Sequence, residues 1–483
     1  MKTDMERIKD NKQSENLYEY DEQFRDSIAT VNKEGKRVWI YPKKPAGYYH
    51  NLRIAVTVFL LAILFAGPFI KINGQPLLLL NIFERKFVVL GATFWPQDFF
   101  LLALTIITFF VFIILFTVSF GRLWCGWACP QTLFMEMVFR KIEYWIEGDA
   151  NQQRKLNQQP WTTDKVIKKA GKQLIFIVIS LLIAHTVMAY LIGIDETIEI
   201  VSQSPTEHFS GFLGLMAFTG IFYFVFARFR EQACTVVCPY GRLQGVLLSK
   251  DSIAVMYDWL RGEPRGKINK AKIEADKGDC IDCKLCVHVC PTGIDIRNGT
   301  QLECVNCTAC IDACDEVMLK VNRPKGLIRY ASYNSILNGK KKLLTPRVAG
   351  YIMVLILLLT VLSYFILSRA DVEATVLRMP GTLYKRSDDG LISNFFNVQV
   401  ANKTFSDKNI ELKIEGLPEA SLHKIGEADM LIPANGLYKG TILVQIPEEL
   451  LTSTKYRIEI GVYESNNKIE TVKTNFLGPV NKK

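Results

Sequence analysis

Long apolar runs alternate with polar segments along the first three quarters of this chain. Five runs are rich in Leu, Ile, Val and Phe and poor in charge: 54–70, 99–120, 174–194, 212–227 and 348–367. A helix needs about 20 apolar residues to cross the hydrocarbon of a bilayer. The second, third and fifth runs are long enough unaided, and the first and fourth become so with tilt or flanking residues. The pattern therefore predicts an α-helical membrane bundle of five spans.

From residue 372 onward the pattern changes to short segments in which apolar and polar residues alternate. About seven such segments are bounded by turn signals such as Asp389-Gly390 and Asn435-Gly436. Alternation with period two is typical of strands, and this spacing predicts an antiparallel sandwich of immunoglobulin type. The segment holds no cysteine, so its core must form without a disulfide. A binding or docking role is the default for such a domain.

Basic residues orient the spans, because loops rich in Lys and Arg stay in the cytoplasm. Segments 1–52, 121–171 and 228–346 carry ten, eight and nineteen Lys and Arg residues, whereas 71–97 carries three and 195–210 none. We therefore expect an inner-membrane protein with its N-terminus in the cytoplasm and its C-terminus outside. This orientation accounts for the net charge of +10, so no nucleic-acid partner is expected.

The cysteines between 280 and 314 form a repeated run. It reads CIDCKLCVHVCP from 280 and CVNCTACIDAC from 304. Two CxxCxxCxxxC runs are typical of bacterial ferredoxins with two [4Fe–4S] clusters, in which the fourth cysteine of each run serves the other cluster. The predicted ligand sets are Cys280, Cys283, Cys286 and Cys314 for one cluster, and Cys304, Cys307, Cys310 and Cys290 for the other. Structural zinc is disfavoured, because zinc sites usually use two separated CxxC pairs.

Two further cysteine pairs follow the second and fourth apolar runs. Cys125 and Cys129 precede one proline, and Cys234 and Cys238 precede another. The repeated CxxxCP motif suggests duplicated hairpins, which a pseudo-two-fold axis would bring face to face at the inner membrane surface. Cysteines four apart on a helix share a face. Each pair could hold Cu(I) or cycle between dithiol and disulfide, or all four could hold one further metal or cluster. Buried structural cysteines are the plainer alternative.

The remaining polar features carry weaker signals. His185 is the ionisable exception inside the spans, where it could ligate haem or copper or carry protons, although a hydrogen bond to a neighbouring helix is commoner. His208 lies on an outer loop. Segment 71–97 is expected to form an interfacial hairpin or helix, 140–172 a polar link with an amphipathic segment, and 1–35 a mobile tail.

Together these patterns divide the chain into five expected parts. They are a cytoplasmic N-terminal segment (1–52), a four-span region with both CxxxCP motifs (53–250), a cytoplasmic 2[4Fe–4S] ferredoxin domain (251–346), a fifth transmembrane helix (347–368) and an exported immunoglobulin-like domain (369–483). All twelve cysteines fall on segments assigned to the cytoplasm, where thiols stay reduced.

This order of parts resembles the CcoG or FixG family of cytochrome c oxidase accessory proteins over nearly the whole chain. Local detail agrees in VLRMPGTLY at 376–384, DGLISN at 389–394 and VANKT at 400–404. The CxxxCP repeats alone are less specific, because polyferredoxin membrane subunits of nitrate and nitrous oxide respiration are similar there. The C-terminal sandwich distinguishes the CcoG or FixG family from those polyferredoxin subunits.

The resemblance implies a role in maturing cbb3-type cytochrome c oxidase, as a reductase that turns Cu(II) into Cu(I) for the oxidase copper centre. It implies iron ligation by the eight ferredoxin cysteines and a copper or redox site at Cys125, Cys129, Cys234 and Cys238. Expected partners are oxidase subunits or copper-delivery proteins, with a cytoplasmic electron donor that no GxGxxG fingerprint identifies. The alternatives are an electron relay to a protein or quinone partner without copper turnover, and a non-enzymatic assembly scaffold.

Overall fold

The computed structural model describes residues 30, 34, 36–72, 74–267, 277–340, 342–387, 389–426, 430–451, 453–464 and 466–479. The tail predicted to be mobile lies almost wholly outside the described residues. The chain divides into two units. The first comprises Met1–Gly67, Ile106–Ala189 and Ile194–Leu359, and the second Pro68–Thr105, Tyr190–Gly193 and Thr360–Lys483.

Five helices in the described part of the chain are long and apolar enough to cross a membrane, as predicted. They are α2 (Tyr48–Ala66), α3 (Phe99–Phe120), α8 (Thr163–Ile192), α10 (Phe209–Phe224) and α16 (Pro346–Leu367). At most 28% of the most apolar window of each helix is buried inside the protein. Their apolar side chains therefore face outward, which suits helices surrounded by lipid.

The ends of two spans differ from the sequence expectation. Helix α8 begins at Thr163 rather than at 174, so the predicted polar link contributes its last residues to the helix. It ends at Ile192 because Gly193 takes a φ of +98°, which favours glycine. Helix α10 continues into a π-helix, η5 (Val225–Phe229), which lengthens the fourth apolar run.

Short helices connect α3 to α8 and pack against the spans of the first unit. They are α4 (Leu123–Trp127), α5 (Pro130–Thr132), the π-helix η4 (Leu133–Phe139), α6 (Arg140–Ile146) and α7 (Ala150–Gln158). Phe139 stacks on Phe226 with 4.9 Å between ring centroids and meets Phe176 edge-on. These buried rings hold η4 against α8 and η5.

Buried ion pairs cross the same region, which the sequence indicated only as a polar link. Glu143 on α6 accepts hydrogen bonds from Arg230 at 2.9 Å and from Lys172 at 3.2 Å. Glu147 lies 2.8 Å from Lys172 and 2.9 Å from Lys169. Burial alone would raise the pKa of Glu143, but Arg230 and the other cations lower it to about 2. Buried charges of this kind persist only when they are paired.

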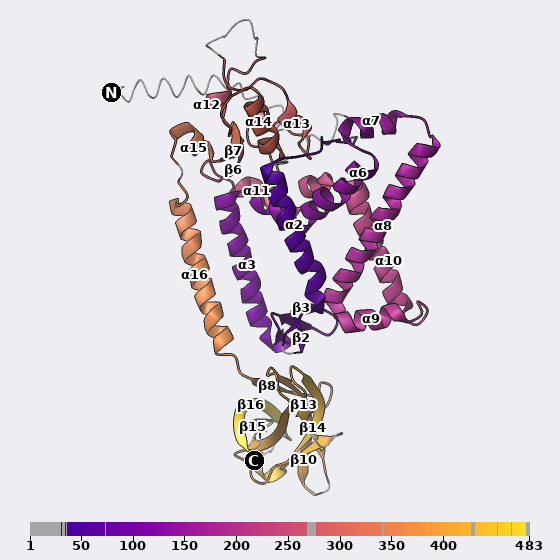
Figure 1. Ribbon diagram of the computed structural model, residues 1–483. Helices are drawn as coiled ribbons and strands as arrows, with labels where there is room; N and C mark the ends of the chain where they lie inside the picture. Colours follow the sequence, from indigo (N-terminus) through magenta and orange to yellow (C-terminus); the bar gives the residue numbers. More distant parts are fainter. Residues whose placement is uncertain are drawn as a thin grey trace, which may run out of the picture. The chain divides into compact units, whose positions relative to one another are not determined.

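The cysteine-rich segment folds beside the N-terminal end of α2 (Figure 1). Strand β6 (Ala254–Tyr257) pairs antiparallel with β7 (Ile328–Ala331) and closes the domain around α13 (Leu285–His288) and α14 (Ala309–Lys320). The N-cap Gly47 has no side chain to cap α2. Asp312 on α14 accepts hydrogen bonds from the amides of Tyr49 at 3.0 Å and His50 at 2.7 Å. A carboxylate from another segment thus satisfies two of the free N–H groups at the start of α2.

The second unit contains the strands. The loop after α2 forms β1 (Lys71–Ile72), β2 (Gln75–Pro76), β3 (Leu78–Asn81), β4 (Lys86–Val89) and β5 (Ala92–Phe94). Strands β3, β4 and β5 make a small antiparallel sheet, so of the two expected forms, hairpin and helix, the segment adopts the first.

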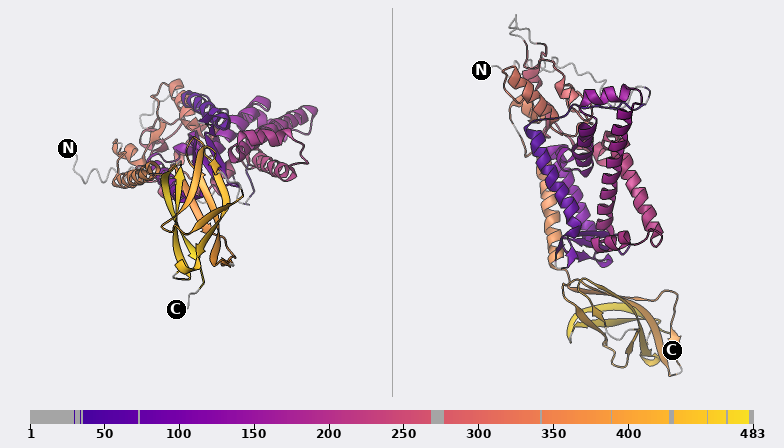
Figure 2. Two further views of the ribbon diagram at one scale, coloured as in Figure 1. Left: turned by 90° about the horizontal axis from the view of Figure 1, so that it is seen from below. Right: turned by 45° about the vertical axis from the view of Figure 1, so that its right-hand side comes forward.

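The C-terminal segment is a β-sandwich, as predicted (Figure 2). Its strands are β8 (Val372–Arg378), β9 (Lys385–Arg386), β10 (Leu391–Asn402), β11 (Lys408–Glu415), β12 (Ser421–Ile425), β13 (Leu431–Ile432), β14 (Leu437–Pro447), β15 (Lys455–Glu464) and β16 (Asn467–Leu477). One sheet has the order β12-β14-β10-β8 with β9 on β10, and the other β13-β11-β15-β16. Alternate residues of each sheet, Phe396 and Phe476 among them, fill the core between the sheets.

Candidate functional site

The eight ferredoxin cysteines surround two cavities. One is lined by Cys280, Cys283, Cys286 and Cys314. The other is lined by Cys290, Cys304, Cys307 and Cys310, and also by Cys286, which lines both cavities. In each cavity three cysteines of one run meet the fourth cysteine of the other run. The structure thus brings the residues together in the two sets that the spacing predicts.

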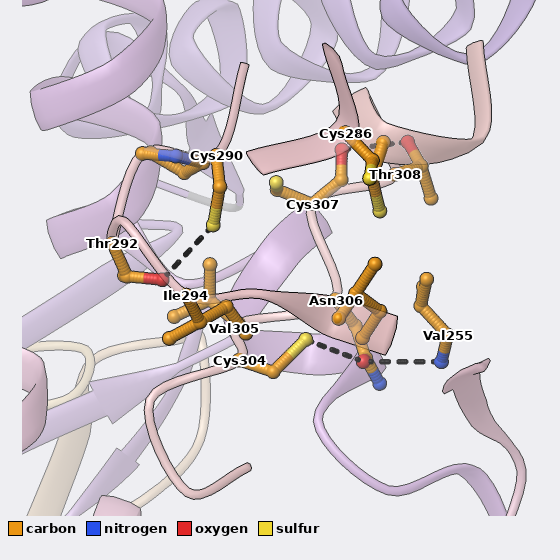
Figure 3. A pocket seen from close by; sticks show the side chains of 13 residues that line it. Val255, Cys286, Cys290, Thr292, Ile294, Cys304, Val305, Asn306, Cys307 and Thr308 are labelled. Atoms are coloured by element: carbon orange, nitrogen blue, oxygen red, sulfur yellow. Dashed lines mark hydrogen bonds between the residues drawn. The ribbon is translucent and has the colours of Figure 1, made fainter. Parts of the chain in front are cut away.

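The second cavity combines sulfur atoms with an apolar wall (Figure 3). Val255, Ile294 and Val305 line it between the cysteines. The sulfur of Cys290 lies 3.3 Å from the hydroxyl of Thr292. The sulfur of Cys304 lies 3.5 Å from the Oδ1 of Asn306, which also accepts from the amide of Val255 at 3.3 Å.

The backbone repeats the same turn in both runs. Asp282 and Lys284 follow the first cysteine with φ of 52° and 55°, and Asn306 and Thr308 follow Cys304 with φ of 53° and 66°. Left-handed residues next to right-handed ones turn successive N–H groups toward one side, which makes a concave site for an anion. Thiolate-ligated iron–sulfur clusters are held by such loops. The internal sequence repeat is therefore also a repeat of backbone conformation.

Burial makes free thiolates unfavourable in both cavities. It raises the pKa of Cys286, Cys304 and Cys314 to about 12. A buried thiolate needs positive charge beside it, and iron supplies that charge. Four cysteines around an apolar cavity thus fit a [4Fe–4S] cluster.

The CxxxCP pairs do not lie on continuous helices, so the expected helical geometry is wrong. Helix α4 ends at Trp127, and Cys129 has extended backbone with φ −65° and ψ 122°. Cys234 lies in the π-helix η6 (Ala233–Val237), and Cys238 is again extended with φ −64° and ψ 113°. The prolines explain this, because proline disfavours helical backbone in the residue before it and starts helices well. Pro130 begins α5 and Pro239 begins α11 (Pro239–Leu247).

The two motifs nevertheless meet. Burial raises the pKa of Cys125 to about 11, and the nearby thiols of Cys129 and Cys238 add to the shift. Burial likewise raises the pKa of Cys234 to about 12, with contributions from the thiols of Cys125, Cys129 and Cys238. Gln244 on α11, fully buried, donates from Nε2 to the sulfur of Cys125 at 3.3 Å. The four thiols thus share one buried environment.

The arrangement of these thiols limits what they can hold. Within the described ranges, no three His, Cys, Asp or Glu side chains converge on a point where they could hold a single metal ion. Two thiolates are enough for an ion that prefers soft ligands, as Cu(I) does. The geometry therefore allows a pair-based site or a larger cluster.

The first CxxxCP motif lies against the second cavity. A Cβ on Gly126 would come within 2.5 Å of the carbonyl oxygen of Val305 and 2.7 Å of that of Asn306. Trp127 donates to the hydroxyl of Tyr330 at 2.9 Å, and that hydroxyl donates to the carbonyl of Asn306 at 3.3 Å. The loop that carries Cys125 and Cys129 therefore touches the loop between Cys304 and Cys307.

His185 and His208 line a separate cavity of about 210 Å³ in the first unit. The Nδ1 of His185 lies 2.8 Å from the carbonyl of Leu181, one turn earlier in α8. His208 lies 2.6 Å from the side chain of Gln203. His185 thus has a hydrogen-bonded partner in its own helix rather than in a neighbouring one.

Sequence reasoning missed three residues beside the motifs. Arg53 is 3% exposed and donates from Nε to the carbonyl of Gly126 at 2.7 Å. Thr132 and Gln244 are fully buried beside the thiols. A polar residue inside an apolar periodic segment was the available signal for Gln244, and a lone arginine at the start of an apolar run was the signal for Arg53.

Comparison with known sequence families agrees with these parts. Residues 102–148 match a 4Fe-4S binding domain, 229–333 a 4Fe-4S dicluster domain, and 362–479 the IG-like fold at the C-terminus of FixG. The first match includes Cys125 and Cys129, and the second includes Cys234 and Cys238 together with both ferredoxin runs.

Three curated relatives are similar along most of the chain. Protein RdxB of Cereibacter sphaeroides is 31% identical over 452 residues, covering 89% of this chain and 90% of the relative. Protein RdxA of the same organism is 31% identical and covers 92% and 98%. The nitrogen fixation protein FixG of Rhizobium meliloti is 31% identical and covers 81% and 82%. With its five spans, its 4Fe-4S domains and its C-terminal sandwich, this chain belongs to the FixG family of membrane iron–sulfur electron-transfer proteins.

Proposed function

We propose that the chain passes single electrons from the cytoplasm to its CxxxCP cysteines and there reduces Cu(II) to Cu(I) for the copper centre of a cbb3-type oxidase. The observation that carries this proposal is the contact between Gly126 and the backbone of Val305 and Asn306. It joins the CxxxCP motif to the loop that presents Cys304 and Cys307. An electron held at the second cavity would have a short path to Cys125 and Cys129.

The ligand sets follow the two cavities. Cys280, Cys283, Cys286 and Cys314 would hold one cluster, and Cys290, Cys304, Cys307 and Cys310 the other. A bound [4Fe–4S] cluster supplies or accepts one electron at a time. The chain fixes the thiolates around each cavity and excludes water with apolar side chains.

The substrate chemistry suits the second group of cysteines. Cu(II) gains one electron to become Cu(I), and thiolates stabilise Cu(I) relative to Cu(II). A pair of thiolates from Cys125, Cys129, Cys234 and Cys238 would bind the ion, while Gln244 orients the sulfur of Cys125. The ferredoxin cysteines have no free valence for this task once they hold iron.

The proposal includes a location and partners. Lys and Arg counts favour the inner membrane with both groups of cysteines in the cytoplasm and the sandwich outside. The sandwich would dock oxidase subunits or copper-delivery proteins. A cytoplasmic protein or small molecule would donate the electrons.

A second function, an electron relay without copper turnover, has one observation in its favour. Residues 102–148, with Cys125 and Cys129, match a 4Fe-4S binding domain. If all four CxxxCP cysteines held a further cluster, the chain would pass electrons to a protein or quinone partner.

The test uses protein purified anaerobically and placed in nanodiscs. After reduction by dithionite and removal of the excess, Cu(II) is added and Cu(I) is trapped with a bathocuproine chelator. Wild type should produce Cu(I), and the pairs Cys125→Ser/Cys129→Ser and Cys234→Ser/Cys238→Ser should produce none while the iron content stays near eight atoms per chain. Met353→Ser removes an exposed sulfur from α16 and serves as the control that should reduce Cu(II) normally.

The possible results distinguish copper reduction from an electron relay and from an assembly scaffold. Loss of iron in the CxxxCP variants would favour the relay with a third cluster. Full copper reduction by those variants would contradict the proposed copper site. Clusters that dithionite cannot reduce would favour an assembly scaffold.

A further inference from the structure

A large cavity lies near the first CxxxCP motif, at the end of α2 that contacts α14 of the ferredoxin domain. Its volume is about 500 Å³. Helix α2, η4 and α6 line it, with the segment that precedes α2. The lining residues are Lys44, Pro45, His50, Arg53, Ile54, Glu136, Met137, Lys141, Tyr144 and Trp145.

The lining carries positive charge without matching negative charge. Arg53 is 3% exposed, and its Nη2 has no hydrogen-bond partner among the described residues. Within the same described ranges, no ion pair reaches Lys44, Arg53 or Lys141. Buried or half-buried cations without a paired anion are costly, and an anion in the cavity would offset that cost.

Nearby carboxylates already have partners outside the cavity or in the backbone. Glu136 faces the cavity, but its Oε1 lies 3.0 Å from Arg140. Glu143 is paired with Arg230 and Lys172. Asp149 accepts from the backbone amides of Lys44 and Ala150 at 2.8 Å. These acids therefore do not balance the charge inside the cavity.

The cations also affect one another. Burial, together with the charges of Arg53 and Lys44, lowers the pKa of Lys141. Cations that destabilise one another across an open cavity are stabilised together by one anion. Arginine and lysine side chains around a cavity match the oxygens of a phosphate.

The surroundings indicate an amphiphilic ligand. The cavity lies at the start of a membrane span, beside Trp145, which is 80% exposed, and Tyr144. Tryptophan and tyrosine favour the headgroup layer of a bilayer. Basic pockets between spans bind the headgroups of anionic lipids. We propose that this cavity binds the phosphate headgroup of an anionic phospholipid.

One side chain, that of Arg53, connects the cavity to the first CxxxCP motif. Arg53 lines the cavity and donates from Nε to the carbonyl of Gly126 at 2.7 Å. A phosphate bound by Lys44 and Lys141 beside Arg53 would hold the guanidinium in place and with it the loop of Cys125 and Cys129. The lipid would thus position the motif rather than take part in its chemistry.

The test measures retained lipid by native mass spectrometry after exchange of the full-length protein into nanodiscs of phosphatidylcholine with 20% phosphatidylglycerol. Wild type should retain phosphatidylglycerol. The variant Lys44→Ala/Lys141→Ala should retain about 30-fold less, at about 1 kcal/mol per basic residue. Lys168→Ala removes a basic residue from the start of α8 outside the cavity and should change nothing.

Further variants distinguish a loss of lipid binding from a folding defect. Further ligands distinguish a lipid phosphate from other phosphate compounds. Lys44→Arg/Lys141→Arg should retain lipid as wild type does, and iron content should be equal in all variants. Equal lipid retention in the alanine variant would overturn the proposal. Lysine-dependent binding of flavin mononucleotide or inorganic phosphate in place of lipid would overturn the lipid assignment as well.

Discussion

Gly126 lies so close to the backbone of Val305 that no other residue fits at position 126 without displacement. A Cβ there would lie 2.5 Å from the carbonyl oxygen of Val305. Glycine is the residue that allows two backbones to approach this closely. The pair links the CxxxCP motif to the ferredoxin domain, so a single added methyl group tests the connection between them.

Gly126→Ala should separate the two loops. The overlap is with backbone atoms that cannot rotate away, and overpacking of this kind costs about 1–3 kcal/mol. We expect slower copper reduction while both ferredoxin clusters remain reducible, measured by stopped-flow trapping of Cu(I) and by EPR. Gly171→Ala adds a methyl group in α8 where nothing lies within 4 Å, and should leave the rate unchanged. An unchanged rate in Gly126→Ala would contradict the proposed electron path.

Cys290→Ser and Cys314→Ser should each disturb the cluster of the opposite run. Cys290 lines the cavity of Cys304, Cys307 and Cys310, although it belongs to the first run in sequence. Replacing a thiolate by a hydroxyl should shift the EPR signal of that cluster, or remove it, and spare the other. A Cys290→Ser spectrum that loses the cluster of Cys280 instead would show that ligation is not crossed.

The sequence was most informative where the chemistry is local. The cysteine spacing predicted which residues gather around each cavity, because short loops largely determine that geometry. Apolar runs likewise predict the spans, and period-two alternation predicts the sandwich. Both patterns follow directly from which side chains avoid water.

The rest depended on contacts between distant segments. Asp312 caps α2 across 262 positions of sequence, and Arg53 reaches Gly126 across 73. No local pattern encodes such partners. The spacing of four predicts the CxxxCP pairs on helices, but the proline that follows each pair disfavours helical backbone at Cys129 and Cys238.

The orientation of the spans can be tested with fusions. A reporter active only outside the cytoplasm should be active when fused after Lys483 or near Ser202, because the flanking loops are poor in Lys and Arg. It should be inactive near Asn269, a position outside the described residues. A cytoplasmic reporter at the same three positions is the matched control and should give the opposite pattern. Activity of the first reporter at Asn269 would reverse the proposed orientation.

Asp98 is the centre of a buried ion cluster in the second unit. It is 4% exposed and accepts from Lys403 at 2.7 Å and from Arg369 at 3.2 Å. Lys403, equally buried, also contacts Glu373 at 2.5 Å. Burial by itself would raise the pKa of Asp98, but the hydrogen bonds and charges of Lys403 and Arg369 outweigh it and lower that pKa below its usual value.

Asp98→Asn should therefore loosen this cluster, because two cations lose their shared carboxylate. Breaking a buried pair costs roughly 3–5 kcal/mol, and hydrogen–deuterium exchange near residues 93–98 and 369 should rise accordingly at pH 7. Since the folded pKa is lowered, the stabilisation exists above the unfolded pKa of about 3.9 and is lost as pH falls through the folded pKa. Wild type should thus lose protection only below about pH 4, and Asp98→Asn should show a flatter response. Glu459→Gln breaks an exposed pair with Lys473 and should cost less than about 1 kcal/mol, so equal exchange in both variants would show that the Asp98 cluster stabilises nothing.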